Sequence, residues 1–307
     1  SISHRKLYSF AIIVFFLKSI GASWDAAFHF KYFRDFLQLP HIVNGIGNFG
    51  VLALLIYLWK KEPKKDRPQI KIILYGVVIF IFAIGFDQWY HKAFGIDLTT
   101  WSPSHFMLYI GTTVALLGAF LFVFRDWRHG HISLRFKKIS GLFFSFLLLD
   151  AFWFPLLQQE QGVILDYTIK NGTNRADPEL LALFLKTQHD IYSGVPGWVY
   201  GAWVVFSIVL VFQLTKRLQL YKFAVTFIAV LYVLERFTMN VIFGVVDYPL
   251  SAVPYYLIIV AALFDVIWNA FKKPSWVRNF LTSLVPIIVL VALSFINLEY
   301  PIHPPIP

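Results

Sequence analysis

Runs of roughly 20 apolar residues recur from one end of this 307-residue chain to the other. Hydrophobic residues make up 58% of the sequence and charged residues only 14%, which is far more apolar than an ordinary globular domain. A helix satisfies its own backbone polar groups inside lipid, and each run is long enough to cross a bilayer in that form. We therefore predict an all-α fold, a polytopic membrane bundle of about nine transmembrane helices.

The predicted spans share this apolar character and are separated by polar segments. They are residues 7–30, 41–59, 70–92, 103–124, 138–157, 191–214, 222–245, 253–271 and 279–298. Residues 1–307 are expected to form one transmembrane domain with a longer outer loop around 158–190. Within that loop, Asp177-Pro178-Glu179 predicts the capped start of a surface amphipathic helix. Asn171 begins a glycosylation acceptor pattern, and its use stays open.

The formal net charge of +10 follows the topology of the chain. Cations gather in every second short loop, which is the distribution that the positive-inside rule describes. We predict a multi-pass protein of the cell membrane with a cytoplasmic N-terminus, whose cations contact lipid head groups rather than nucleic acid. The chain contains no cysteine, so disulfides and thiolate metal sites are excluded.

An Asp-x-x-x-His pattern occurs twice where a predicted span reaches the outer face, at Asp25–His29 and at Asp87–His91. Residues four apart lie one turn apart on the same helix face. The next span opens at Ser102-Pro103, a good helix start, and places His105 in its first turn. Asp87, His91 and His105 can thus converge. One carboxylate and two imidazoles are ligands suited to copper, zinc or iron, so we predict an outward-facing metal site here.

Asp25 and His29 are included as candidate ligands, and several roles remain open for them. They can complete a second metal site, support the first as neighbours of its ligands, or line a proton path. They can also be interfacial side chains beside Trp24. His41 follows Pro40 at the start of the next span and is a further candidate for the cluster.

The stretch that contains Asp87, His91, Asp97 and Ser102-Pro103-Ser104-His105 resembles the C subunit of the copper membrane monooxygenases, the particulate methane and ammonia enzymes. In that family an Asp-x-x-x-His sequence near a helix end is followed by a further Asp and by Thr-Pro-x-His. The resemblance implies that Asp87, His91 and His105 bind copper. It also implies a subunit of a monooxygenase-type oxidoreductase complex, with other membrane subunits as partners. It assigns no catalytic residue, and it leaves open whether this chain is itself an enzyme.

Two other functional classes fit the sequence. A b-type haem needs two histidines on facing helices, and His29 with His91 can supply them. The second class is a transporter or a purely structural subunit. In such a protein the Asp and His residues would form a hydrogen-bond network between helices.

Ionisable residues deep in the predicted spans need partners, because an unpaired charge in lipid is costly. Glu235 and Arg236 are adjacent and point about 100° apart on a helix, so each is expected to meet a different partner. For Arg236 the expected partner is Asp150 or Asp265, and the alternative is that these groups form a proton or substrate route to the outer site.

Overall fold

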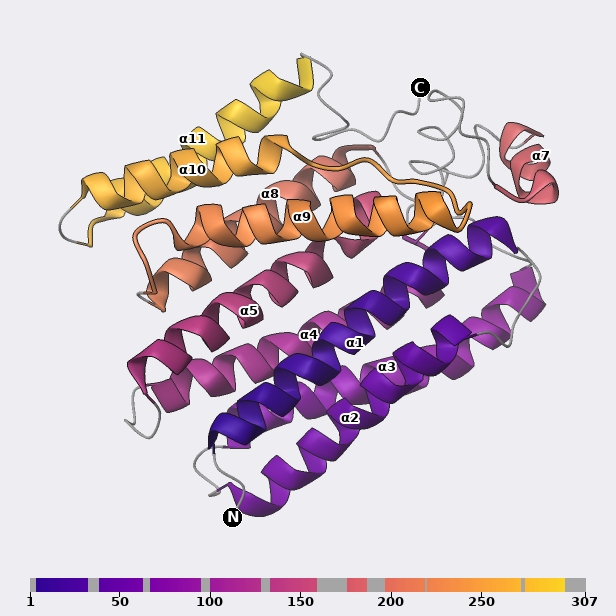
Figure 1. The fold of residues 1–307 in the computed structure, drawn as a ribbon, viewed down its shortest axis with the longest axis horizontal. Coiled ribbons are helices and arrows are strands. Elements are labelled where there is room, and N and C mark those ends of the chain that lie inside the picture. The colour runs from indigo at the N-terminus through magenta and orange to yellow at the C-terminus, as the bar shows by residue number, and fades with distance from the viewer. Residues whose placement is uncertain are drawn as a thin grey trace.

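The computed structural model describes residues 4–32, 39–62, 67–94, 100–127, 133–158, 176–186, 197–218, 220–271 and 274–295. These residues form a bundle of helices, and no strand occurs among them (Figure 1). The helices in chain order are α1 (His4–Lys31), α2 (Leu39–Lys61), α3 (Arg67–Phe94), α4 (Pro103–Trp127), α5 (Leu134–Trp153), α7 (Pro178–Lys186), α8 (Gly197–Arg217), α9 (Ala224–Val245), α10 (Tyr256–Ala270) and α11 (Trp276–Phe295). A single π-helical turn, η2 (Phe154–Gln158), continues α5.

The all-α membrane architecture predicted from the sequence is confirmed. Each of the nine predicted spans corresponds to a helix, and eight of these helices are long and apolar enough to cross a membrane. The ninth, α10, is apolar but has only 15 residues. Large apolar side chains such as Phe49, Ile81 and Phe82 point outward, as expected for surfaces in contact with lipid. The chain is therefore a multi-pass membrane protein.

The helix predicted to begin at Asp177-Pro178-Glu179 is also confirmed, as α7. The Oδ1 atom of Asp177 accepts hydrogen bonds from the backbone N–H groups of Glu179 at 2.8 Å and Leu180 at 3.3 Å. This is the helix cap that the sequence predicted. The glycosylation pattern at Asn171 lies outside the described residues.

Helix α5 forms the centre of the bundle. It packs against α1, α4, α8 and α9, and most of its side chains are buried. The Nε1 atom of Trp153 donates a hydrogen bond to Ser207 Oγ in α8 at 3.0 Å, and Trp203 Nε1 of α8 donates to the carbonyl of Phe152 at 2.6 Å. Indole groups thus join α5 to α8 while their rings fill the core.

Buried charges join helices in the other half of the bundle, and here one prediction is wrong. Glu235 and Arg236 were expected to meet different partners, but they pair with each other: Arg236 Nε donates a hydrogen bond to Glu235 Oε2 at 2.9 Å. Two long side chains can bridge the angle between adjacent helical positions. Asp265 of α10 pairs with Lys216 Nζ at 2.7 Å, although Lys216 lies in the last turn of α8. Its four-carbon stem allows the ammonium group to reach the bundle interior.

Within the first four helices, two hairpins are held by unusually close backbone contact. A Cβ atom added to Gly47 of α2 would lie 2.8 Å from the backbone nitrogen of Lys18 in α1. A Cβ atom on Gly111 of α4 would lie 2.7 Å from the backbone nitrogen of Phe80 in α3. Small residues permit such close approach between helices in a membrane. The pairs α1–α2 and α3–α4 are therefore tightly packed units.

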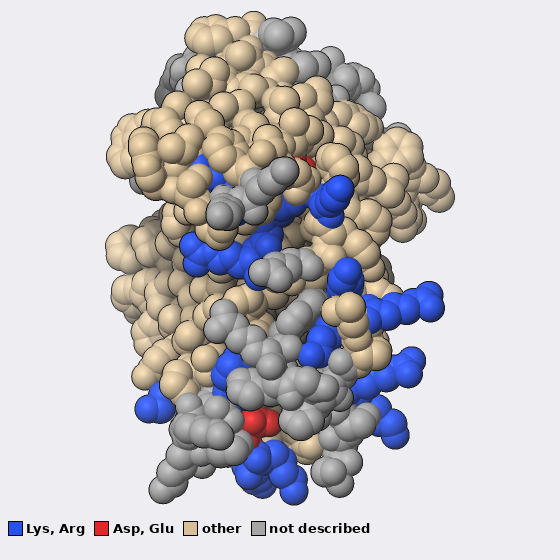
Figure 2. Space-filling view, turned by 90° about the vertical axis from the view of Figure 1, so that its left-hand side faces the viewer, with Lys and Arg blue, Asp and Glu red and all other residues tan. Residues whose placement is uncertain are grey.

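The two hairpin tips lie at one end of the bundle, on the right in Figure 1, where α1 and α3 end and α2 and α4 begin. Figure 2 shows the opposite end, on which lysine and arginine side chains gather. Basic residues occupy the last turns of α2, α4 and α8 at that end. The described part of the molecule thus has a cationic end and an end that carries the Asp-x-x-x-His sequences.

Two glycines of α3 provide a matched test of the packing. We predict that Gly76→Ala lowers the free energy of unfolding by about 1–3 kcal/mol, because its Cβ atom would lie 2.2 Å from the backbone nitrogen of Ala115. Gly85→Ala meets nothing within 4 Å and should stabilise the protein slightly, since alanine favours helix over glycine. Unfolding in mixed detergent micelles measures both values. Equal effects of the two substitutions would contradict the proposed hairpin packing.

Candidate metal centres

Asp87, His91 and His105 come together at the tip of the α3–α4 hairpin, as the sequence predicted. The Oδ1 atom of Asp87 lies 3.4 Å from His91 Nε2 and 3.4 Å from His105 Nε2. The three side chains are each about one quarter exposed, with values between 23% and 27%. Two imidazoles from different helices therefore face a single carboxylate oxygen in a partly solvated setting.

The start of α4 is held in place by local hydrogen bonds. Ser102 Oγ accepts a hydrogen bond from the backbone N–H of His105 at 3.3 Å, which confirms the predicted helix cap. Just before it, Thr100 Oγ1 and Trp101 Nε1 both donate to the carbonyl of Pro155, at 3.3 and 3.1 Å. The π-helical turn after α5 thus supplies the acceptor that fixes the connection from α3 to α4.

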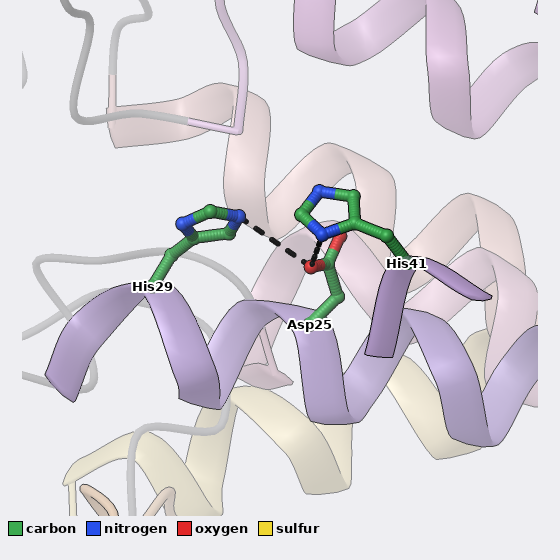
Figure 3. Close-up of side chains that lie close together, drawn as sticks. All are labelled: Asp25, His29 and His41. Atoms are coloured by element: carbon green, nitrogen blue, oxygen red, sulfur yellow. Dashed lines mark ion pairs between the residues drawn. The ribbon is translucent and has the colours of Figure 1, made fainter. Parts of the chain in front are cut away.

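A second cluster of the same composition lies at the tip of the α1–α2 hairpin. Figure 3 shows the imidazoles of His29 and His41 directed at the carboxylate of Asp25. The Oδ1 atom of Asp25 lies 3.4 Å from His29 Nε2 and 3.4 Å from His41 Nδ1. Asp25 and His29 come from the last turns of α1, whereas His41 comes from the first turn of α2.

Helix α1, which carries Asp25 and His29, is held in place by contacts with several other parts of the bundle. Ser19 donates a hydrogen bond to Asp150 of α5, and Ser23 Oγ accepts one from Arg236 of α9 at 3.1 Å. At its end, the carbonyl of Phe30 accepts a hydrogen bond from the backbone N–H of Asp177, just before α7, at 2.7 Å. The second half of α1 is therefore held by α5, α9 and the residue before α7.

The donor spacing in both clusters is compatible with a bound metal ion. Metal–nitrogen and metal–oxygen bonds of about 2.0–2.2 Å in a tetrahedral site place the donor atoms about 3.3–3.6 Å apart. The carboxylate–imidazole distances of 3.4 Å lie in that range, while an N–H···O hydrogen bond is usually shorter, about 2.7–3.2 Å. All donor atoms within each cluster lie within 4.8 Å of one another.

Unpartnered polar atoms support the same interpretation. Asp25 Oδ1, His41 Nδ1 and Asp87 Oδ1 are buried and take part in no hydrogen bond. A buried acceptor without a donor is destabilising, and a coordinated cation would remove that cost. The residues present therefore fit a metal with three protein ligands and an open position, without thiolate.

The described residues form two separate candidate groups, so Asp25 and His29 do not join the cluster of His91 and His105. The third residue of the group that contains Asp25 and His29 is His41, which the sequence indicated only as a further candidate. His29 and His91, the pair considered for a haem, each lie next to their own aspartate. Asp97, the remaining residue of the monooxygenase-like stretch, lies outside the described residues.

Comparisons of the chain with protein-family models, with curated proteins and with solved structures find no match.

Proposed function

We propose that this chain is a copper-binding integral membrane subunit of a monooxygenase-type oxidoreductase complex. The observation that carries the proposal is the convergence of His91 and His105 on Asp87 Oδ1, which takes part in no hydrogen bond. The order Asp-x-x-x-His, then Ser-Pro-x-His at the next helix start, resembles the copper-binding sequence of the C subunit in that family. The donor set excludes the thiolates typical of many zinc and iron–sulfur sites, and zinc is the main competitor for it.

Each of the three residues has a distinct part in holding the ion. Asp87 supplies the negative charge that offsets part of the cation's charge, and His91 is aligned with it by one helical turn. His105 closes the site from the second helix, where the cap at Ser102 fixes its backbone. A bound copper ion supplies one-electron redox chemistry and an open position for a small ligand such as O₂. The membrane brings apolar substrates and quinol to the same depth.

Aromatic side chains next to this cluster favour an apolar neighbour. Phe82, Phe86 and Trp89 are stacked along one face of α3, with ring centroids 5.9 and 5.6 Å apart. Phe82 and Trp89 are more than half exposed, at 60% and 55%. Exposed aromatic surface of this kind suits lipid or another membrane subunit, and we assign the face beside the cluster to a partner subunit of the complex.

The cationic end of the bundle supports a cytoplasmic N-terminus in the cell membrane. Both Asp/His/His clusters then face outward, where metal ions are delivered without crossing the bilayer. In this orientation the basic residues at the ends of α2 and α4, together with the exposed Arg217 of α8, contact anionic lipid head groups.

Removal of a cluster histidine provides the test of the metal assignment. We expect His91→Ala and His105→Ala each to lower bound copper and quinol-dependent O₂ consumption of the membranes together, because both need the ion. His4→Ala, at the opposite end of α1, is the control and should change neither. Copper is measured by elemental analysis and by the Cu(II) electron paramagnetic resonance signal. Full copper content after both substitutions contradicts the proposal, and isolation with zinc alone contradicts the choice of metal.

Orientation can be tested because the chain has no natural cysteine. Lys61→Cys, at the exposed end of α2, should react with a membrane-impermeant thiol reagent only after the cells are opened. Phe94→Cys, 69% exposed at the end of α3, should react in intact cells. The reverse pattern of labelling contradicts the proposed orientation.

A further inference from the structure

The two Asp/His/His clusters are related by a repeat in the sequence. Asp25 and His29 precede Asp87 and His91 by the same 62 residues, and His41 precedes His105 by 64. In each case the aspartate and first histidine end one helix and the second histidine begins the next. The two-residue difference lies in the connection between the helices, where insertions are tolerated.

The helix crossings repeat as well, and they do so independently of the clusters. Gly47 lies against the backbone of Lys18, and Gly111 lies against the backbone of Phe80. Lys18 and Phe80 each precede the cluster aspartate by seven residues, and each glycine follows the second histidine by six. The two hairpins therefore share one helix register, although their other side chains differ.

The equivalent positions also meet where the hairpins pack together. Lys18 Nζ lies 3.7 Å from the ring centroid of Phe80, so the crossing point of one hairpin contacts the crossing point of the other. Two copies of one unit packed side by side commonly bring equivalent positions into contact. The arrangement is that expected of a duplicated hairpin.

We propose that Asp25, His29 and His41 form a second metal centre, so that the chain binds two transition-metal ions, one at each hairpin tip. The ligand class is a divalent or monovalent cation that accepts one carboxylate and two imidazoles. The inference rests on the metal chemistry of the proposed function, extended to the first hairpin. Its own observations are the 3.4 Å spacing around Asp25 Oδ1 and the absence of hydrogen bonds to that atom and to His41 Nδ1.

The second centre differs from the first in its surroundings. His41 is the most exposed of the four cluster histidines, at 39%, against 25% for His105. Helix α1 is held by α5, α9 and the residue before α7, whereas the start of α2 packs on α1, where a Cβ atom on Gly21 would lie 2.6 Å from the backbone nitrogen of Asn44. A metal ion shared by Asp25, His29 and His41 would add a further link between the start of α2 and the end of α1.

Metal stoichiometry tests the inference. Full-length protein in detergent is stripped with a chelator, equilibrated with buffered copper or, in parallel, zinc, and desalted, and the metal per chain is measured by elemental analysis. We expect two equivalents for the unchanged protein, one each for His29→Ala and His91→Ala, and none for the double variant. Asp25→Asn should also bind one. Asp247→Asn is the matched control, since Asp247 is an exposed carboxylate at the same end and pairs with Lys31.

The failures of the two proposals are distinguishable. One equivalent in the unchanged protein, retained in His29→Ala and lost in His91→Ala, overturns the second centre and leaves the proposed function intact. One equivalent retained in His91→Ala and lost in His29→Ala supports the second centre and contradicts the assignment of Asp87, His91 and His105. The unfolding temperature of each variant without metal, equal to that of the parent, shows that the loss is local.

Discussion

Backbone contact between the two helices of each hairpin determines where the chemically important side chains meet. At Gly47 and Gly111 the helices approach so closely that a single added carbon atom would clash with the opposite backbone. This contact fixes the register of one helix on the other, and a shift of one residue would rotate each side chain by about 100°. Asp25 and Asp87 lie two turns beyond the contact in their helices, so the convergence at both tips depends on it.

Local patterns in the sequence predict much of this structure. Apolar runs set the helices because lipid offers backbone groups no other partner, and the i, i+4 spacing aligns Asp87 with His91. The cap at Ser102 predicts where His105 begins its helix. The role of His41 was only a candidate, because its contact with Asp25 depends on the packing of α1 and α2. If the two Asp-x-x-x-His sequences are treated as a repeat, His41 stands in nearly the same position after His29 as His105 does after His91, and this could have revealed its role.

The buried charges show a second limit of sequence-based prediction. Helix geometry places adjacent side chains about 100° apart, yet the flexible stems of Glu235 and Arg236 bring their charged groups together. Lys216 likewise reaches Asp265 from the end of α8. Side-chain length rather than backbone direction decides these pairs. Lys216–Asp265 joins α8 to α10, and a hydrogen bond from Arg236 to Ser23 links α9 to α1. The two hairpins and the second half of the bundle together place the two Asp/His/His clusters at one end of the bundle, while lysine and arginine side chains gather at the other.

The central claim is that the two Asp/His/His clusters bind transition metals, and anomalous diffraction from crystals of metal-loaded protein tests it most directly. Data collected on both sides of the copper and zinc absorption edges locate each ion and identify the element. We predict one anomalous peak among Asp87, His91 and His105 and another among Asp25, His29 and His41, each about 2.0–2.2 Å from its donor atoms. Loaded crystals with no peak at either cluster, or with direct hydrogen bonds between the carboxylates and imidazoles in place of an ion, would contradict it.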